Sequence, residues 1–255
     1  MCRSLGNQSV SGRAQAISLD LSQRVSLAEY PEWMDAPCSY EELRACLRDI
    51  AAVNRLTAAY RPTLQWLDHL YAVMPLQDKP LHIVDVGCGS GDMLRQIHGW
   101  AGDRNLPVVL TGIDINPDAI RAAREVTRPG VATFLAGDAF AFEPEGGIDV
   151  VVSSLLTHHL ENAEIVEFLR WMEAKARLGW FVNDLHRQAV PYHFFKTFSR
   201  LTRWHPFVKH DGPVSILRSF RGEDWQALCR AAGLPEKGVR IRESWPARLC
   251  VARIR

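Results

Sequence analysis

The sequence has no long apolar run, no surplus of charge of one sign and no closely spaced pair of cysteines. A membrane-spanning helix needs about 20 mostly apolar residues, so none is expected, and the polar segment before residue 26 lacks the apolar core of a secretory signal. The net charge of +1 gives no general attraction to nucleic acid. The six cysteines stand apart, with no C-x-x-C pair, as expected of reduced thiols. These absences predict a cytoplasmic protein that does not bind nucleic acid.

The most informative segment is a glycine-rich turn between a strand and a helix. The apolar run Leu81–Val86 predicts a buried strand, and Gly87, Gly89 and Gly91 follow at alternate positions. Glycines there let the backbone take positive φ and approach a ligand closely, and the helix start behind the turn offers free N–H groups. A dinucleotide fingerprint would need its third glycine at position 92, where this chain has Asp92. The turn therefore argues against a nicotinamide cofactor.

Four more apolar segments follow the turn at intervals that leave room for helices. They are Val108–Asp114, 132–136, Ile148–Ser154 and 179–184. Strands that alternate with helical segments, and that are apolar along their whole length, are typical of a parallel sheet covered on both faces. The predicted fold class is α/β: a Rossmann-like, doubly wound, mostly parallel seven-stranded sheet, with two C-terminal strands completing it.

The G-x-G-x-G turn and the order of these segments resemble the class I (Rossmann-like) S-adenosylmethionine-dependent methyltransferases. The likeness is to the branch that includes ubiquinone/menaquinone-type and polyketide-tailoring enzymes. It covers the core from residue 81 to residue 184 well and both ends poorly. The resemblance implies S-adenosyl-L-methionine as the cofactor, bound at the carboxyl edge of the sheet.

Two acids that end strands are the clearest candidate cofactor contacts. Asp114 can accept hydrogen bonds from both ribose hydroxyls, although it could instead cap the helix that begins near Pro117. The resemblance carries a contact with the adenine amino group onto Asp138, with a solvated loop acid as the alternative. It puts Gly87 and Gly89 against the methionine end of the cofactor. The full set of expected cofactor-binding residues is Asp85, Gly87, Gly89, Gly91, Asp114, Ile115, Asp138, Ala139 and Ser153.

His158 and His159 are the candidate catalytic residues, because they follow the fourth predicted strand at the edge where a methyl group would be transferred. An imidazole can accept the proton of a phenol or another hydroxyl near neutral pH. The alternatives are that one ring caps a helix and the other packs. His186 and His210 carry lower weight. No metal is expected, because the fourth strand ends in Ser153-Ser154, without the carboxylate ligand of the metal-dependent catechol-type enzymes.

The 255 residues, of which 47% are hydrophobic and 23% charged, suffice for one sizeable α/β domain with additions. Residues 1–79 are expected to form an N-terminal helical extension that acts as a lid. A capping box at Ser39 and Glu42 predicts one helix, and Arg61-Pro62 begins a second. Residues 80–255 are expected to form the S-adenosylmethionine-binding methyltransferase domain, with an insert at 185–212.

The insert is unusually aromatic and basic. Its aromatic residues are Tyr192, Phe194, Phe195, Phe198, Trp204 and Phe207, and its bases are Arg187, Lys196, Arg200, Arg203 and Lys209. One hypothesis is an acceptor pocket with aromatic walls and a basic rim. The other is that the aromatics pack an extra helix on the core while the bases face water. The two are not exclusive.

The sequence thus predicts methyl transfer to a small molecule, at a phenolic or enolic oxygen of an aromatic, polyketide, quinone-like or lipid-tailed acceptor. Carbon methylation of an activated ring is the main alternative. A noncatalytic S-adenosylmethionine-binding partner module is another, since fold alone does not decide function. A macromolecular acceptor is less favoured, because the fourth-strand loop lacks the Asn/Asp-Pro-Pro-aromatic signature of amino-group methylation. The identity of the acceptor and the oligomeric state stay open.

Overall fold

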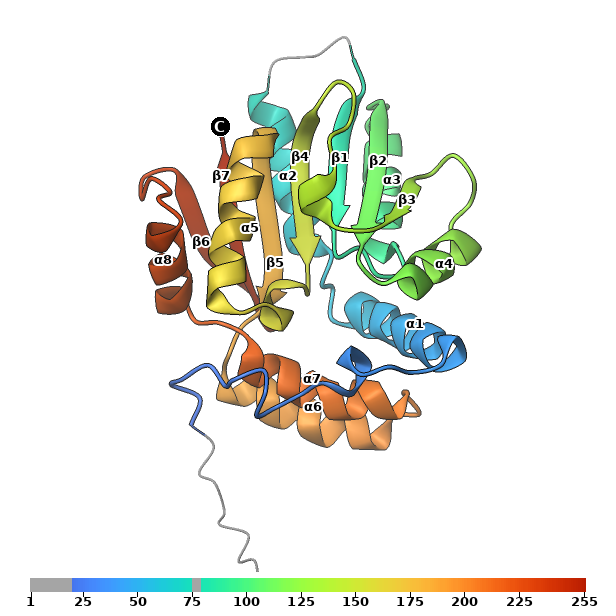
Figure 1. Cartoon of the computed structure of the whole chain (residues 1–255), viewed down its shortest axis with the longest axis vertical. Coiled ribbons are helices and arrows are strands. Elements are labelled where there is room, and N and C mark those ends of the chain that lie inside the picture. The colour runs from blue at the N-terminus through green and yellow to red at the C-terminus, as the bar shows by residue number, and fades with distance from the viewer. Residues whose placement is uncertain (1–19, 75–78) are drawn as a thin grey trace, which may run out of the picture.

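The computed structural model describes residues 20–74 and 79–255, and its seven strands form one sheet in the order β3-β2-β1-β4-β5-β7-β6 (Figure 1). The strands are β1 (Leu81–Val86), β2 (Val108–Asp114), β3 (Thr133–Ala136), β4 (Ile148–Ser154), β5 (Ala176–Leu185), β6 (Val239–Ser244) and β7 (Arg248–Ile254). The first five pair in parallel, and β7 is antiparallel to both β5 and β6. This arrangement confirms the predicted Rossmann-like sheet.

Helices cover both faces of the sheet, which explains why the central strands β1 and β4 are buried along almost their whole length. α2 (Arg61–Val73), α3 (Asp92–Gly102) and α4 (Pro117–Val126) pack with Ile83 on one face, and α5 (Asn162–Lys175) and α8 (Gly222–Ala231) pack with Val84 on the other. These two neighbouring residues of β1 are both fully buried, because successive side chains of a strand point to opposite faces. None of the described helices is long and apolar enough to cross a membrane.

A third layer lies beyond the carboxyl ends of the parallel strands (Figure 1). It consists of the short helix η1 (Trp33–Asp35) with α1 (Tyr40–Leu56), α6 (Ala189–Leu201) and α7 (Pro206–Arg218). Ser39 caps α1 and exchanges hydrogen bonds with Glu42, so the predicted capping box is present. The two helices expected in the N-terminal segment therefore form, but only α1 joins this layer, because the apolar stripe of α2 is buried on the sheet.

The expected insert forms two antiparallel helices, α6 and α7, and the second continues past Gly212 to Arg218. Residues 20–30 run alongside them (Figure 1): Leu21, Val25 and Tyr30 pack against Tyr192 and Ile216. The chain thus brings its N-terminal segment and its insert together over the sheet edge where the glycine turn lies.

Candidate active site

The turn after β1 needs glycine for two separate reasons. Gly87 and Gly91 both have positive φ, at 71° and 73°, which L side chains rarely adopt. Neither has space for a side chain: a Cβ on Gly91 would lie 2.5 Å from the ring of Phe134, and one on Gly87 would lie 2.9 Å from Leu156. The turn is therefore fixed in shape, with α3 beginning directly behind it.

Gly91→Ala is expected to lower the free energy of unfolding by about 1–3 kcal/mol, because the new Cβ meets Phe134 at a backbone position that disfavours it. Gly99→Ala is the matched control, since Gly99 is exposed within α3 and has nothing within 4 Å of its Cβ position. That substitution should raise the free energy of unfolding by about 0.5–1 kcal/mol. Urea denaturation measures both, and an unchanged midpoint for Gly91→Ala would contradict this account of the turn.

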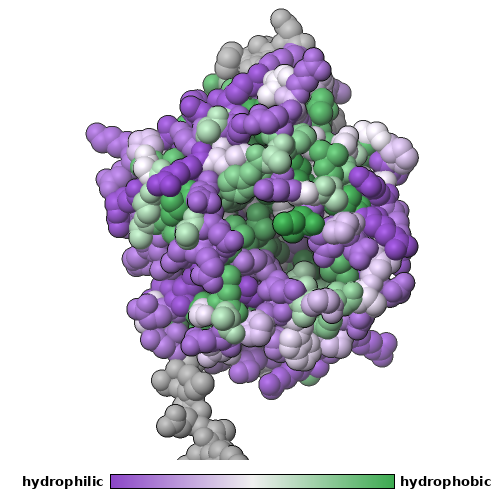
Figure 2. Space-filling model, in the orientation of Figure 1, coloured by the Kyte–Doolittle hydropathy of each residue, from purple (hydrophilic) through white to green (hydrophobic). Residues whose placement is uncertain are grey.

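A cavity of about 470 Å³ lies between the glycine turn and the third layer. Figure 2 shows apolar residues gathered around a hollow in the middle of this face of the molecule. The turn and the ends of β1, β2 and β4 form its floor, with Asp85, Gly87, Gly89, Asp114, Ile115 and Leu156 among the lining residues. The third layer forms its roof, with Leu43, Leu47, Ile50, Phe195, Val208 and Ile216. Segments from both ends of the chain therefore enclose one space.

Two carboxylates on the floor of the cavity have unusual environments. Asp85 is buried, and its Oδ1 has no hydrogen-bond partner among the described residues. Burial, reinforced by the nearby charges of Asp92 and Asp114, raises the pKa of Asp85 well above its usual range. Asp114 accepts the backbone N–H of Gly89 through Oδ2 and that of Asn116 through Oδ1, both at 2.9 Å. Because each carboxylate oxygen has two lone pairs, both acids can still accept a donor from the cavity.

A buried arginine reaches the same cavity from β7. Arg248 donates from Nη2 to Oδ1 of Asn54 at 3.0 Å, while its Nη1 has no partner among the described residues. Asn54 and the hydroxyl of Tyr60 donate in turn to Oδ2 of Asp92, at 3.2 and 2.7 Å. The sequence alone did not reveal this group, because its members come from α1, the residue before α2, α3 and β7 and form no local motif.

His158 lies in the short helix η3 (Thr157–His159) and is held by an acid at the end of β5. Its Nδ1 lies 2.7 Å from Oδ1 of Asp184, and its backbone N–H donates to Oδ2 of the same carboxylate at 3.0 Å. Burial alone would raise the pKa of Asp184, but His158 and the hydroxyl of Thr157 lower it well below its usual range. The carboxylate is therefore ionised, and it fixes the orientation of the His158 ring.

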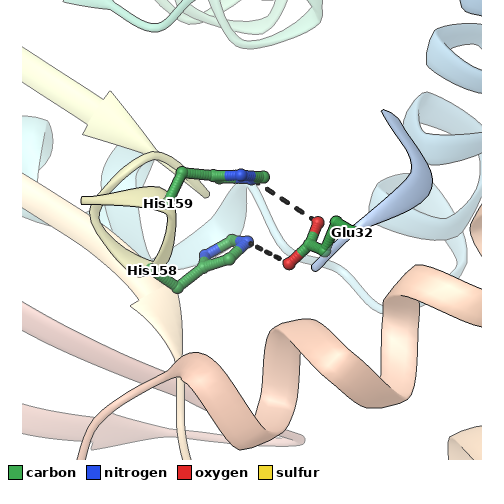
Figure 3. Close-up of side chains that lie close together, drawn as sticks. All are labelled: Glu32, His158 and His159. Carbon is green, nitrogen blue, oxygen red and sulfur yellow. Dashed lines mark ion pairs between the residues drawn. The ribbon is translucent and has the colours of Figure 1, made fainter. Parts of the chain in front are cut away.

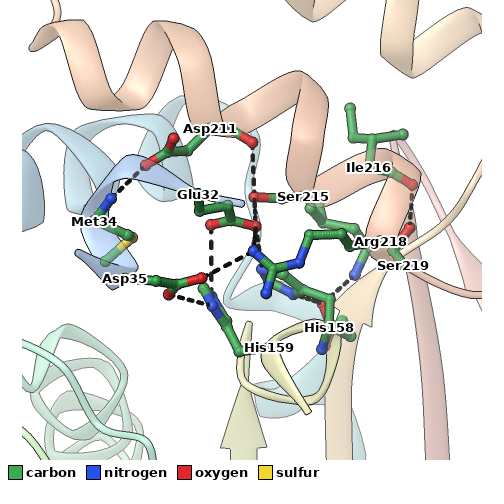
Figure 4. A network of polar contacts seen from close by, with 12 residues as sticks. Glu32, Met34, Asp35, His158, His159, Asp211, Ser215, Ile216, Arg218 and Ser219 are labelled. Atoms are coloured by element: carbon green, nitrogen blue, oxygen red, sulfur yellow. Dashed lines mark hydrogen bonds and ion pairs between the residues drawn. The ribbon is translucent and has the colours of Figure 1, made fainter. Parts of the chain in front are cut away.

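His159 is held in the same way from the N-terminal segment. Its Nδ1 lies 3.0 Å from Oδ1 of Asp35, and both rings turn their Nε2 atoms toward the buried carboxylate of Glu32 (Figure 3). Burial raises the pKa of Glu32 to about 7, although His159 and Arg218 oppose the shift. Arg218 bridges the two acids, with Nη1 3.3 Å from Oε1 of Glu32 and 2.9 Å from Oδ2 of Asp35 (Figure 4).

The fold agrees with what comparisons with known proteins show. Residues 83–178 match a family model described as a methyltransferase domain. Residues 83–178 therefore belong to a methyltransferase domain.

The relatives of this methyltransferase domain act on different kinds of molecule, as their names state. The chain is 30% identical over 190 residues to the 2-methyl-6-phytyl-1,4-hydroquinone methyltransferase of Synechocystis sp., a match that covers 62% of this chain and 58% of that protein. It is 33% identical over 138 residues to the ribosomal protein L11 methyltransferase of Burkholderia thailandensis, covering 51% and 40%. The chain thus spans between two fifths and three fifths of the length of these relatives.

Solved structures show the same fold at low identity. The plantazolicin methyltransferase BpumL, in complex with a triazolic desmethylPZN analog and SAH, superposes with a TM-score of 0.59 at 18% identity, covering 85% of this chain and 96% of that one. Human N-acetylserotonin methyltransferase in complex with SAM gives a TM-score of 0.59 at 14% identity, covering 85% and 56%.

Not every residue expected to contact the cofactor lines the cavity of the methyltransferase domain. Asp85, Gly87, Gly89, Asp114 and Ile115 do, together with His158 and His159, whereas Gly91, Asp138, Ala139 and Ser153 do not. Ser153 donates to the carbonyl of Val86 at 2.9 Å, Ala139 is buried in the core, and the exposed Asp138 caps a short helix through the N–H of Phe140. The cofactor contacts of these residues stay predictions.

The insert contributes less to the cavity than its composition suggested. Of its six aromatic residues only Phe195 lines the cavity, and none of its five bases does. The expected basic rim is wrong for Arg187, which is buried and donates to the carbonyls of Ser219 and Leu21 and to Asp224. His186 and His210 also lie outside the lining, and His210 stacks on Trp33 with a centroid distance of 3.9 Å.

Proposed function

We propose that this protein transfers the methyl group of S-adenosylmethionine to a phenolic or enolic oxygen of a small aromatic, polyketide or quinone-like acceptor. One observation carries the proposal: the glycine turn with its two acids and the histidine pair line the same cavity. A donor held on the floor and an acceptor held below the roof would meet within it. Such closeness and alignment are most of what an in-line displacement requires.

The residues on the floor fit the cofactor. The free oxygen of Asp85 suits the ammonium group of its amino-acid end, and the remaining lone pairs of Asp114 suit the ribose hydroxyls. Ile115, which is 81% exposed and lines the cavity, offers an apolar surface for the adenine ring. S-adenosylmethionine supplies a sulfonium-bound methyl group that is already a reactive electrophile.

The acceptor side supplies a group that can take a proton. With Nδ1 of His158 donating to Asp184, the neutral ring has its lone pair on Nε2, on the side of the cavity. A hydroxyl that loses its proton there becomes a far better nucleophile. The acceptor oxygen then forms a bond to the methyl carbon while the sulfur–methyl bond breaks, and the electron pair stays on sulfur to give S-adenosylhomocysteine.

The size of the cavity favours a small acceptor. Pockets of about 300–1,000 Å³ typically bind small molecules, and the cavity of about 470 Å³ lies within this range. Because the cofactor would occupy part of this volume, the space left for the acceptor suits a small molecule. The name of the Synechocystis relative points to a hydroquinone acceptor. Carbon methylation is the second candidate on the same observation, because ionising a phenol also activates the ring carbons beside the oxygen.

The direct test is turnover with small acceptors. The purified protein is incubated with S-adenosylmethionine and a panel of phenols, hydroquinones and cyclic 1,3-diketones, and products are identified by mass spectrometry and NMR. A methylated product that forms together with S-adenosylhomocysteine supports the proposal, and the NMR spectrum distinguishes an oxygen-methyl from a carbon-methyl group. Methylation of ribosomal protein with no turnover of any small acceptor would refute it.

Phe195→Ala is expected to raise the KM for the acceptor several-fold and to leave that for S-adenosylmethionine nearly unchanged. Full burial of a Phe side chain contributes roughly 1.5–3 kcal/mol, or about 10- to 150-fold in affinity, and Phe195 is only partly buried, so a smaller effect is expected. Phe195 lines the roof of the cavity. Phe194→Ala is the matched control, because its neighbouring ring is 64% exposed and outside the lining. Equal effects of the two substitutions on the acceptor KM would show that α6 does not contact the acceptor.

A further inference from the structure

We propose that Glu32, His158 and His159 bind a divalent transition-metal cation at the acceptor end of the cavity. Each residue offers one ligand atom, and these three atoms lie within 4.8 Å of one another. Nε2 of His158 is 3.8 Å from Oε1 of Glu32, and Nε2 of His159 is 3.7 Å from Oε2 (Figure 3). Ligands about 2.1 Å from a shared cation lie roughly 3–3.5 Å from one another, so a small movement completes the site.

The contacts between Glu32 and the two rings are too long to be hydrogen bonds. The donors to Glu32 all reach Oε1, which accepts from the hydroxyl of Ser215 at 3.0 Å and faces Arg218. No described side chain donates to Oε2. The Nε2 atoms of the two histidines and the carboxylate of Glu32 therefore face one another without forming hydrogen bonds. A cation between them would accept a lone pair from each residue.

The outer contacts of both histidines are those of metal ligands. A histidine that binds a metal through one nitrogen almost always donates its other N–H to a carboxylate, a carbonyl or water. Here Nδ1 of His158 meets Asp184 at 2.7 Å, and Nδ1 of His159 meets Asp35 at 3.0 Å. These bonds place the lone pair of each neutral ring on Nε2, directed at Glu32. Acids from β5 and η1 thus orient the two imidazoles so that both Nε2 atoms face Glu32.

The local charge favours a cation as well. The carboxylates of Glu32, Asp35 and Asp184 contact the two rings, whereas among the described guanidinium and ammonium groups only that of Arg218 contacts any of these acids (Figure 4). Three acids and one guanidinium group therefore contact the proposed ligand set directly, and such a surplus of acids attracts a divalent cation.

Two imidazoles and one carboxylate suit Zn²⁺, Fe²⁺, Co²⁺ or Mn²⁺ better than Mg²⁺, which prefers oxygen ligands. All three ligands line the cavity, so the remaining coordination positions face its interior, as in catalytic metal sites. The site differs from the catechol-type arrangement on which the expectation of no metal rested, because Glu32 replaces a ligand at the end of β4.

The role of the cation rests on the proposed function. It would hold an oxygen of the acceptor and favour its ionised form, which selects acceptors with an ionisable oxygen, and best those with two adjacent oxygens. In that state His158 and His159 are ligands, and the proton of the hydroxyl passes to solvent. Transfer of the proton to Nε2 of His158 would then take place only when no metal is bound.

Metal binding can be measured without any substrate. The full chain is stripped with EDTA, and titration with Co²⁺ is followed by visible absorption and calorimetry, with Zn²⁺ as the competing ion. One equivalent is expected to bind, with d–d bands of a nitrogen- and oxygen-ligated site. Glu32→Gln, His158→Asn and His159→Asn should abolish these bands, and Asp35→Asn should weaken binding about 10- to 100-fold. His98→Asn, at an exposed histidine of α3 outside the cavity, should bind as wild type does.

The possible results separate this proposal from the proposed function. Binding of one cation that the three ligand variants lose, with turnover that EDTA abolishes and Zn²⁺, Mn²⁺ or Fe²⁺ restores, supports both. If the wild-type protein shows no saturable metal binding, or if the three ligand variants bind the metal as the wild type does, the metal site is refuted. Turnover that persists in EDTA would then support His158 as a general base. Specific metal binding without affinity for S-adenosylhomocysteine would instead refute the proposed function and leave the metal site standing. Circular dichroism of each variant shows whether it folds.

Discussion

Replacing His158 with alanine is expected to lower turnover by about 10²- to 10⁴-fold, as loss of a general base does, while the affinity for S-adenosylhomocysteine stays nearly constant. The ring lines the cavity and makes its hydrogen bond with Asp184, not with the glycine turn. Loss of a metal ligand at this position predicts the same fall in turnover and the same unchanged affinity for S-adenosylhomocysteine. Initial rates and calorimetry measure them.

Alanine also leaves the buried carboxylate of Asp184 without its main partner, so a second variant is needed. His158→Asn keeps an N–H donor for Asp184 but cannot accept a proton on a ring nitrogen. It should fold and bind the cofactor product while losing turnover to a similar extent. His98→Asn is the control for a histidine outside the site. If both His158 variants keep full turnover, the histidine has no part in the reaction.

Asp114→Ala should have the largest effect on cofactor binding. Each lost hydrogen bond to a charged group costs about 1.5–3 kcal/mol, so S-adenosylhomocysteine should bind roughly 10- to 150-fold more weakly for each ribose contact. The acid also accepts a hydrogen bond from the backbone N–H of Gly89. The affinity of Asp114→Asn, which keeps one acceptor oxygen, is therefore expected to lie between those of the wild type and the alanine variant. Asp103→Ala, at an exposed acid that ends α3, is the control. An unchanged affinity of Asp114→Ala would contradict the ribose contact.

The fold could be predicted from the sequence because its signals are local. Strands such as β1 and β4 are apolar along their whole length since both faces are buried, and glycines mark the turn that follows β1. The capping box at Ser39 indicates where α1 begins from residues three positions apart. Each of these patterns lies within a dozen residues, which is the distance over which backbone preference and side-chain periodicity act.

The acceptor end could not be predicted in the same way, because its parts meet only in the folded chain. Glu32 lies 126 positions from His158 in the sequence, and the residues around it form no motif that marks a buried acid. Arg187 shows the opposite error. Its place in a basic, aromatic insert predicted a solvated charge, whereas packing of residues 20–30 on α7 buries it among backbone carbonyls. Histidines after β4 were the one local signal, since a strand's carboxyl end fixes where the next residues lie.

Calorimetric titration of the wild-type protein with S-adenosylhomocysteine and, separately, with NADH tests the central claim most directly. The cavity has two acids suited to the ammonium and ribose of the first ligand, and the turn has Asp92 where a dinucleotide site needs glycine. The expected result is saturable binding of one S-adenosylhomocysteine per chain and no measurable binding of NADH. Tighter binding of NADH than of S-adenosylhomocysteine would contradict the assignment of the cavity to methyl transfer.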